Sequence, residues 1–278
     1  NNFIGNISAD AVLEQLREQN ETKKQTVAFD KKNYLNTRLE NGQTSKTLTI
    51  RLLPFNDKSA TPFFKVYTHI VKVNKELAPG GWKQFICPAK NHIEGQTSDK
   101  CPFCETAKKA REIKFETEDP IQREKMNKVE FQNSARESWI VRCIERGHEE
   151  DGVKFWLFSH SRKGDGIYDK IMNIFQRRYS KGRENGEIKN IFDLQEGKDL
   201  EITVTLDTNG KSIINIVDDD SYSPLSTDVE QANQWINDPK QWYDVYSMKS
   251  YDYMSIVING DVPYYNKDLK KYVKKEEA

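Results

Sequence analysis

The chain has 278 residues, of which 36% are hydrophobic, 31% charged and 11% aromatic. This length suffices for one large domain or two modest ones, and the mean hydropathy of -0.83 indicates a polar chain with a generous share of aromatic side chains. No stretch approaches the roughly 18 to 20 consecutive apolar residues of a membrane span, and the amino end has no apolar signal-peptide core. We therefore expect an intracellular protein with no membrane partner.

Charge is unevenly distributed along the chain, although the formal net charge is +0. Residues 31–115 hold sixteen Lys and Arg against seven Asp and Glu, whereas residues 218–268 hold ten Asp and Glu against three Lys. A basic segment fits a polyanionic partner, but a local imbalance of charge can also simply solvate a surface. Charge alone does not decide between these two interpretations.

Hydrophobic periodicity and turn residues predict a chain of mixed α and β structure. Ser8 is expected to cap a helix at 9–21, and a polar linker or arm follows at 22–42. Alternating apolar residues then predict strands, and a spacing of 3.6 predicts helices. The expected strands are 47–53, 63–73, 82–86, 138–145, 153–159, 200–206 and 212–217. The expected helices are 102–115, 120–129 and 167–179, followed by a helical, Trp-rich stretch at 228–247 and a final hairpin within 254–273.

Three cysteines and one histidine have the spacing of a zinc site. Cys101 and Cys104 are separated by two residues, as in a zinc knuckle, and Cys87 lies a short loop before them. With His69 they form a closed set of four ligands, which would staple a long polar loop. His92, inside that loop, is an alternative fourth ligand. A redox Cys-x-x-Cys pair and thiols that only fill space are the less favoured interpretations.

Strand alternation places aromatic and cationic side chains on outward faces, where single-stranded nucleic acids are bound by base stacking and phosphate contacts. Arg51 is expected to point away from the core. If Phe155 and Leu157 fill the interior, then Lys154 and Trp156 lie outside. The alternative is that each Trp packs beneath a following helix. The candidate contacts are Arg51, Lys65, Tyr67, Trp82, Trp139, Arg142, Lys154 and Trp156.

No pattern indicates catalysis. A zinc hydrolase needs an open metal position, and three Cys with one His close the shell. The chain has no His-Glu-x-x-His, phosphate-binding Gly-Lys-Ser/Thr or Gly-x-Ser-x-Gly motif. The fourth cysteine, Cys143, is expected to be a buried apolar residue and not a ligand. We expect no enzymatic activity. The competing functions are a protein-binding scaffold that uses the acidic region around Trp235 and Trp242, and binding of single-stranded RNA.

The order of these elements over about residues 45–220 resembles the single-stranded DNA-binding, or helix-destabilising, proteins of T-even-like bacteriophages. In that family a His, Cys, Cys, Cys zinc site is built into an OB-fold, and His69 occupies the place of its histidine. The other matching segments are Ile50-Arg51-Leu52-Leu53-Pro54, Gly81-Trp82-Lys83, Lys100-Cys101-Pro102-Phe103-Cys104, Glu137-Ser138-Trp139, Val153-Lys154-Phe155-Trp156-Leu157 and Ile167-Tyr168-Asp169-Lys170-Ile171-Met172.

The resemblance implies an α+β fold, namely an OB-fold-type antiparallel five-stranded β-barrel with an inserted zinc-binding subdomain and peripheral helices. The expected divisions are an amino-terminal helix and arm at 1–42, an OB-fold core at 43–220 with its zinc subdomain at about 69–130, and an acidic, Trp-rich segment at 221–278. One structural Zn²⁺ is implied. The resemblance puts Arg51, Trp82, Trp139 and Lys154 at or near the DNA cleft, and it adds Lys83 and Arg136 to the candidate contacts.

The function that the resemblance implies is sequence-independent binding and protection of single-stranded DNA during phage-type replication, recombination or repair, in the cytoplasm of an infected bacterial host. The chain departs from the family in four ways. Only Arg136 remains of a basic run, Ser138 replaces a stacking Tyr, and neither a basic arm for self-association on DNA nor a long Asp/Ser-rich tail is evident. The acidic segment 218–268 is expected to replace that tail, either by occupying the cleft or by recruiting replication proteins.

Overall fold

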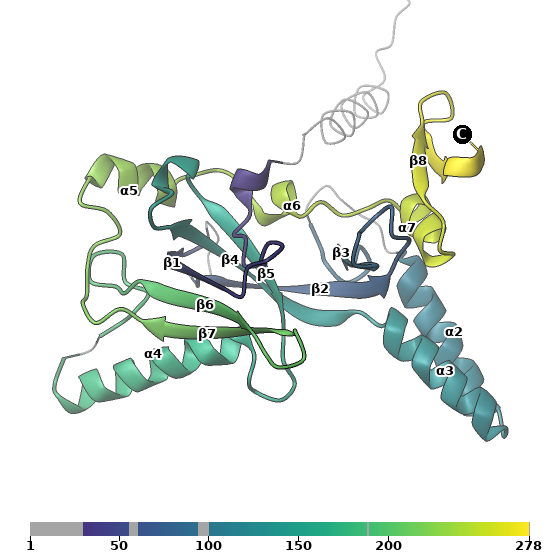
Figure 1. Cartoon of the computed structure of the whole chain (residues 1–278), viewed down its shortest axis with the longest axis horizontal. Helices are drawn as coiled ribbons and strands as arrows, with labels where there is room; N and C mark the ends of the chain where they lie inside the picture. Colours follow the sequence, from purple (N-terminus) through teal and green to yellow (C-terminus); the bar gives the residue numbers. More distant parts are fainter. Residues whose placement is uncertain (1–29, 56–60, 94–99, 188, 278) are drawn as a thin grey trace, which may run out of the picture.

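An antiparallel sheet of seven strands runs through the molecule. The structure, a computed structural model, describes residues 30–55, 61–93, 100–187 and 189–277 (Figure 1). The helix expected at 9–21 lies outside these residues. The strands are β1 Ser45–Leu53, β2 Phe63–Lys72, β3 Trp82–Ile86, β4 Arg136–Glu145, β5 Lys154–Ser159, β6 Leu200–Leu206 and β7 Ser212–Asp218. Each agrees with its expected strand to within two residues at either end, because alternation of apolar side chains is a local signal.

β4 is the hub of the sheet, because it pairs with three strands. Its first half pairs with β2 and its last residues with β1, while β5 occupies its other edge. β1 then pairs with β6, and β6 with β7. Within the described residues β3 pairs only with β2 and β7 only with β6, so the sheet does not close. The α+β class and the antiparallel sheet are confirmed, whereas the five-stranded OB-type barrel is not confirmed, since β6 and β7 extend the sheet.

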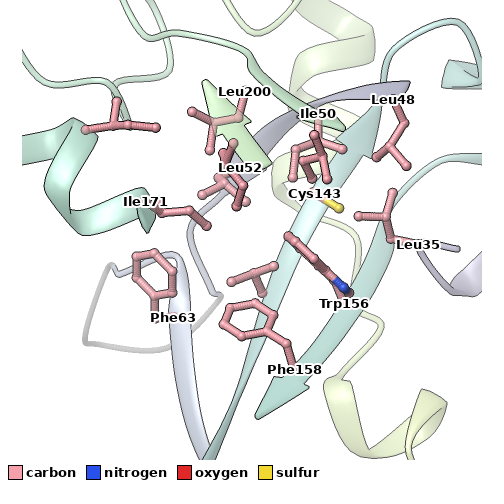
Figure 2. Close-up of a cluster of buried hydrophobic side chains, with 14 of the residues drawn as sticks. Leu35, Leu48, Ile50, Leu52, Phe63, Cys143, Trp156, Phe158, Ile171 and Leu200 are labelled. Atoms are coloured by element: carbon pink, nitrogen blue, oxygen red, sulfur yellow. The ribbon is translucent and has the colours of Figure 1, made fainter. Parts of the chain in front are cut away.

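One face of the sheet forms the first hydrophobic core. Leu48, Ile50 and Leu52 alternate along β1 and point to this face, where Ile171 of α4 (Ile167–Glu184) packs against them (Figure 2). The helix presents its apolar stripe to the sheet, as expected for a helix that covers one side of a strand layer. The other strands contribute Phe63, Val141, Cys143, Trp156, Phe158, Leu200, Ile202, Val204 and Ile216.

The opposite face of the sheet is covered by the carboxy-terminal segment. Trp235 of α5 (Val229–Ile236) and Trp242 of α6 (Trp242–Val245) are buried in a second core with Leu53, Ile140 and Phe155 of β1, β4 and β5. Both faces of these central strands are therefore buried, which the sequence analysis did not foresee.

A helical hairpin projects from the end of β2 (Figure 1). It consists of α2 (Pro102–Glu116) and α3 (Pro120–Asn133), each with a proline in its first turn, where a missing N–H costs nothing. α7 (Tyr251–Ile258) packs against α2 and supports a third core that contains Phe85 and Phe103. Among the described residues, short 3-10 helices occur at Lys31–Asn33, Glu149–Asp151 and Lys275–Glu277.

The final hairpin is shorter than expected. β8 (Pro263–Asn266) pairs with β9 (Lys271–Lys274), and the preceding residues form α7 instead of a strand. The prediction of a hairpin strand from 254 was wrong, because the Ser250 side chain accepts a hydrogen bond from the backbone N–H of Tyr253 and caps a helix. The buried residues of this helix recur at helical spacing.

Candidate metal centre and nucleic-acid surface

Four side chains converge between β2, β3 and α2. Their ligand atoms all lie within 4.8 Å of one another. Nε2 of His69 is 3.3 Å from Sγ of Cys101 and 3.7 Å from Sγ of Cys104, and Sγ of Cys87 is 3.5 Å from Sγ of Cys104. A tetrahedral zinc ion with bonds of about 2.0–2.3 Å separates its ligand atoms by about 3.5–3.8 Å. The four side chains therefore fit one tetrahedral ion.

The surrounding backbone orients these ligands. Nδ1 of His69 lies 2.9 Å from the carbonyl oxygen of Asn133, at the end of α3. If Nδ1 carries the proton and donates this hydrogen bond, the lone pair of Nε2 faces the cysteines, as in most histidine–metal sites. Cys101 and Cys104 lie at the start of α2, where the helix dipole favours negative charge. The ring of Phe103 lies 5.1 Å from that of His69 and closes one side of the cluster.

The three thiols are too close to ionise together without a cation. Hydrogen bonds from Cys101 and Cys87 lower the pKa of Cys104 to about 3. The pKa of Cys87 is raised well above its usual value, mainly by its hydrogen bonds to Cys101 and Cys104 and by burial. A divalent cation removes this conflict, because metal ligation stabilises thiolates. The geometry thus favours a metal site over a redox pair.

The remaining cysteine and histidine candidates lie apart from this cluster. His92 is exposed and does not belong to it, so the structure favours His69 as the fourth ligand. Cys143 is fully buried in the first core, and its thiol donates to the carbonyl of Lys154 at 3.7 Å. Its expected role as a buried apolar residue is confirmed.

Aromatic and cationic side chains gather where β2 pairs with β4. Lys65 lies directly opposite Trp139, with its Nζ 5.6 Å from the centre of the indole ring. Tyr67, the next residue on the same face of β2, carries Nζ of Lys90 at 5.2 Å over its ring. Trp139 stacks on Tyr168 of α4 with ring centres 4.4 Å apart and planes 8° apart. We call Lys65, Tyr67, Trp139 and Tyr168 the β2–β4 aromatic face.

Three members of this neighbourhood were missed by the sequence analysis. Nε1 of Trp139 donates to Nδ1 of His160 at 3.3 Å, which fixes the indole. Tyr168 and Lys90 come from α4 and from the loop after β3, so only the fold brings them here. A usable signal was present for Tyr168, since it lies in one of the segments that carried the family resemblance.

The remaining candidates that are not fully buried are Trp82, which is exposed, and the partly buried Lys83 and Arg136. Trp82 is 56% exposed and pairs with Lys72, on the face opposite to the β2–β4 aromatic face. Arg136 also belongs to that face, and its guanidinium lies 4.2 Å from the centre of the exposed Phe131 ring. Lys83 is half-buried, and burial lowers its pKa. The structure therefore divides the predicted DNA contacts between the two faces.

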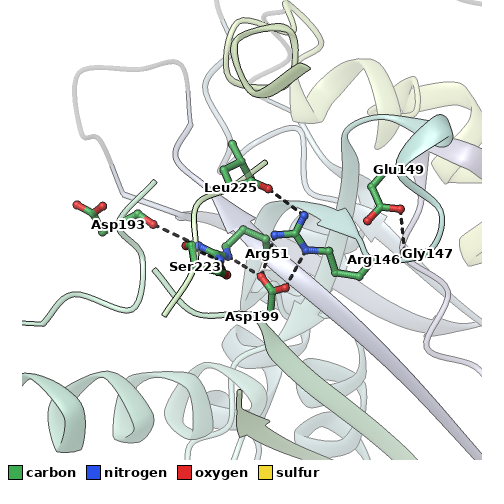
Figure 3. Close-up of polar contacts among 8 residues, drawn as sticks. All are labelled: Arg51, Arg146, Gly147, Glu149, Asp193, Asp199, Ser223 and Leu225. Carbon is green, nitrogen blue, oxygen red and sulfur yellow. Dashed lines mark hydrogen bonds and ion pairs between the residues drawn. The ribbon is translucent and has the colours of Figure 1, made fainter. Parts of the chain in front are cut away.

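Arg51 does not point away from the core, contrary to the expectation. It is 1% exposed, and its Nε binds Asp199 at 2.6 Å while its Nη2 donates to Oγ of Ser223 at 2.7 Å (Figure 3). Arg146 binds the other side of the same carboxylate at 2.8 Å. Gly197 leaves the necessary room, because a Cβ there would lie 2.5 Å from Nη1 of Arg51. Residues beyond β7 cover this face of β1. Alternation within β1 alone therefore predicted an exposed Arg51, although the side chain is buried.

Arg142, Lys154 and Trp156 are buried as well. Arg142 is 1% exposed and donates to the carbonyls of Trp235 and Asp238, both at 3.2 Å. Nζ of Lys154 binds Glu145 at 2.6 Å. Trp156 is 3% exposed in the first core. The expectation that Lys154 and Trp156 lie outside was wrong, because β5 is covered on both faces.

The Trp-rich region is not an open surface. Trp235 and Trp242 are 6% and 3% exposed. The Trp242 ring lies 5.4 Å from that of Phe64, on the back of β2. These two side chains therefore cannot be the working surface that the scaffold interpretation required.

A model of the family described as gp32 DNA binding protein like matches residues 43–258. The chain belongs to this gp32-like family of DNA-binding proteins. The match covers β1 to β7, the metal cluster and the β2–β4 aromatic face, and it ends at the last residue of α7. No curated protein matches the chain. Among the described residues, none of the helices combines the length and the apolar character that crossing a membrane requires.

Proposed function

We propose that this gp32-like protein binds single-stranded DNA without sequence preference and that the β2–β4 aromatic face is its stacking surface. The observation that carries the proposal is the Trp139 and Tyr168 stack beside Lys65. Single strands are bound where aromatic rings stack on bases and cations contact phosphates. Membership of a DNA-binding family supports the same conclusion.

The proposed role is protection of single strands during phage replication, recombination or repair in the cytoplasm of the bacterial host. The protein acts without catalysing a reaction. It associates with itself on DNA, and the acidic segment 218–268 recruits replication proteins. Membership of a DNA-binding family supports the DNA-related role, and the negative charge of this segment supports contact with a basic partner.

We further propose that His69, Cys87, Cys101 and Cys104 hold one structural Zn²⁺. Thiolate and imidazole ligands in a closed tetrahedral set are typical of structural zinc. When bound, the ion would tie the start of α2 to β2 and β3 and hold the third core together. Metal analysis of the purified protein tests this assignment, with one zinc per chain as the expected result.

The test of DNA binding is a fluorescence titration with oligo-dT at two salt concentrations. Trp156, Trp235 and Trp242 are buried, so quenching reports Trp82 and Trp139. We expect strong quenching in the wild type, most of it lost in Trp139→Phe. Lys65→Gln should lower the slope of log K against log salt by about 0.7, the value of one phosphate contact on a single strand.

Lys181→Gln, at an exposed position far along α4, is the matched control and should leave both affinity and slope unchanged. Competition with oligo-U and with duplex DNA distinguishes DNA from RNA and single from double strands. Absence of binding at low salt by the zinc-loaded wild type refutes the proposed function. If Trp139→Phe and Lys65→Gln both bind with the quenching and salt slope of the wild type, the DNA-binding surface is not the β2–β4 aromatic face.

A further inference from the structure

The last hairpin of the chain, which overlaps the end of the acidic segment 218–268, is itself basic. Residues 262–275 contain five lysines and one aspartate, together with three tyrosines. The family match ends at residue 258, so β8 and β9 lie beyond it. This basic, aromatic hairpin is an element that the proposed function does not use.

The hairpin is held firmly against the third core. The ring of Tyr272 packs edge-on against Tyr253 of α7 at 5.0 Å, and Tyr265 packs against Tyr272 at 5.3 Å. Nζ of Lys275 binds Glu76, in the loop between β2 and β3, at 2.7 Å. These contacts place the packed face of the hairpin against the third core.

The register of the two strands separates a packed face from an outward face. Tyr265 and Tyr272 are directly opposite each other and share the packed face. Tyr264, one residue earlier, belongs to the outward face together with Lys271. Tyr264 is 52% exposed. Lys271 and Lys267 of the turn are exposed, and neither forms an ion pair in the part of the chain that the structure describes.

We propose that the β8–β9 hairpin is a second contact site for single-stranded DNA. Tyr264 stacks on a base, while Lys271 and Lys267, which lie nearer the turn of the hairpin, contact neighbouring phosphates. An acidic peptide would need only the cations, whereas an exposed aromatic ring beside two cations is the combination that binds single strands. The site would lengthen the strand that one molecule covers beyond the β2–β4 aromatic face. This inference rests on the proposed function.

The test compares the wild type with Tyr264→Ala/Lys267→Gln/Lys271→Gln on two lengths of oligo-dT, about 8 and about 20 nucleotides, since related folds cover roughly 4–16 nucleotides. We expect the variant to bind the longer strand about 10-fold or more weakly, with a salt slope reduced by about 1.4, and to bind the shorter strand as the wild type does. Tyr264→Phe keeps the ring and should keep the affinity. Lys211→Gln, in the turn of the β6–β7 hairpin, is the control for loss of a turn lysine.

A direct measurement supports the comparison. Photocrosslinking of the wild type to oligo-dT that carries 5-iodouracil should give an adduct on the peptide that contains Tyr264. The second site is overturned if the triple variant binds both lengths with the affinity and salt slope of the wild type and the wild type gives no such adduct. That result leaves the proposed function intact. If the wild type binds neither length, the proposed function itself has failed. A thermal melt of the variant checks that its fold is unchanged.

Discussion

Replacing Arg51 by Met tests whether this side chain stabilises the fold or contacts DNA. The sequence predicted a DNA contact at this position. Met keeps the apolar volume of the side chain and removes the guanidinium. The structure predicts a loss of stability, because Arg51 is 1% exposed and joins Asp199, directly before β6, to Ser223 of the carboxy-terminal segment. It predicts no direct effect on DNA binding by the folded protein.

The magnitude follows from the partners that remain. Breaking a buried ion pair costs about 3–5 kcal/mol, since one charge is left without compensation. Asp199 keeps Arg146, which binds its two oxygens at 2.8 Å and 3.0 Å, so the lower end of that range, about 3 kcal/mol, is expected. For a chain of this size about 2–4 °C of Tm corresponds to 1 kcal/mol, so the Tm should fall by about 6–12 °C.

Thermal melts and oligo-dT titrations of Arg51→Met, with the exposed Arg38→Met as the matched control, check this prediction. The control should change the unfolding free energy by no more than about 0.5 kcal/mol. In a double-mutant cycle, Arg51→Met and Asp199→Asn should show non-additive losses, because they remove the same pair. An unchanged Tm with weaker, less salt-dependent DNA binding would refute the structural interpretation and restore Arg51 as a DNA contact.

Two further predictions concern the metal and pH. Cys101→Ser should abolish zinc binding and lower the Tm strongly, since zinc contributes about 10–16 kcal/mol to the folding of zinc-finger peptides. His92→Ala should retain one zinc per chain. Zinc retained by Cys101→Ser and lost from His92→Ala would show that the ligands are assigned wrongly. Burial opposes ionisation of Asp199, but hydrogen bonds from Arg146 and Arg51 prevail and lower its pKa. Its contribution to stability is thus complete above the unfolded-state pKa of about 3.9 and is lost as pH falls through the lower folded-state pKa. Urea midpoints measured below pH 4 should therefore fall less steeply in Asp199→Asn than in the wild type, and parallel curves would contradict this account.

The strands and the metal ligands were predictable because their signals are local. Alternation fixed the bounds of all seven strands to within two residues. The Cys-x-x-Cys spacing identified the knuckle, and the structure brings His69 to it through the pairing of β2 with β3. His69 and His92 could not be separated from spacing alone, since the distinction depends on which one the sheet carries into the cluster.

The environments of the strand faces were not predictable from the strands themselves. Alternation correctly divided β5 into two faces, but it cannot tell what covers each face. Phe155 and Trp156 point to opposite sides, and both are buried because α4 covers one side and residues after β7 cover the other. Arg142 shows the same effect, since its acceptors Trp235 and Asp238 lie more than ninety residues further along the chain and its acceptor Pro54 lies 88 residues earlier. Such long-range coverage leaves no periodic signal in the covered strand.

The placement of the Trp-rich part of the acidic segment bears on its two expected roles. Trp242 packs on Phe64, whose neighbour Lys65 belongs to the β2–β4 aromatic face, and adjacent residues of a strand point to opposite sides. The Trp-rich part of the segment thus covers the back of the sheet behind the proposed DNA surface. Held there by Trp235 and Trp242, it does not occupy the front, where it would compete with a nucleic acid. Its exposed carboxylates, such as Asp244, face solvent, so the proposed recruitment of replication proteins would leave the proposed DNA surface open.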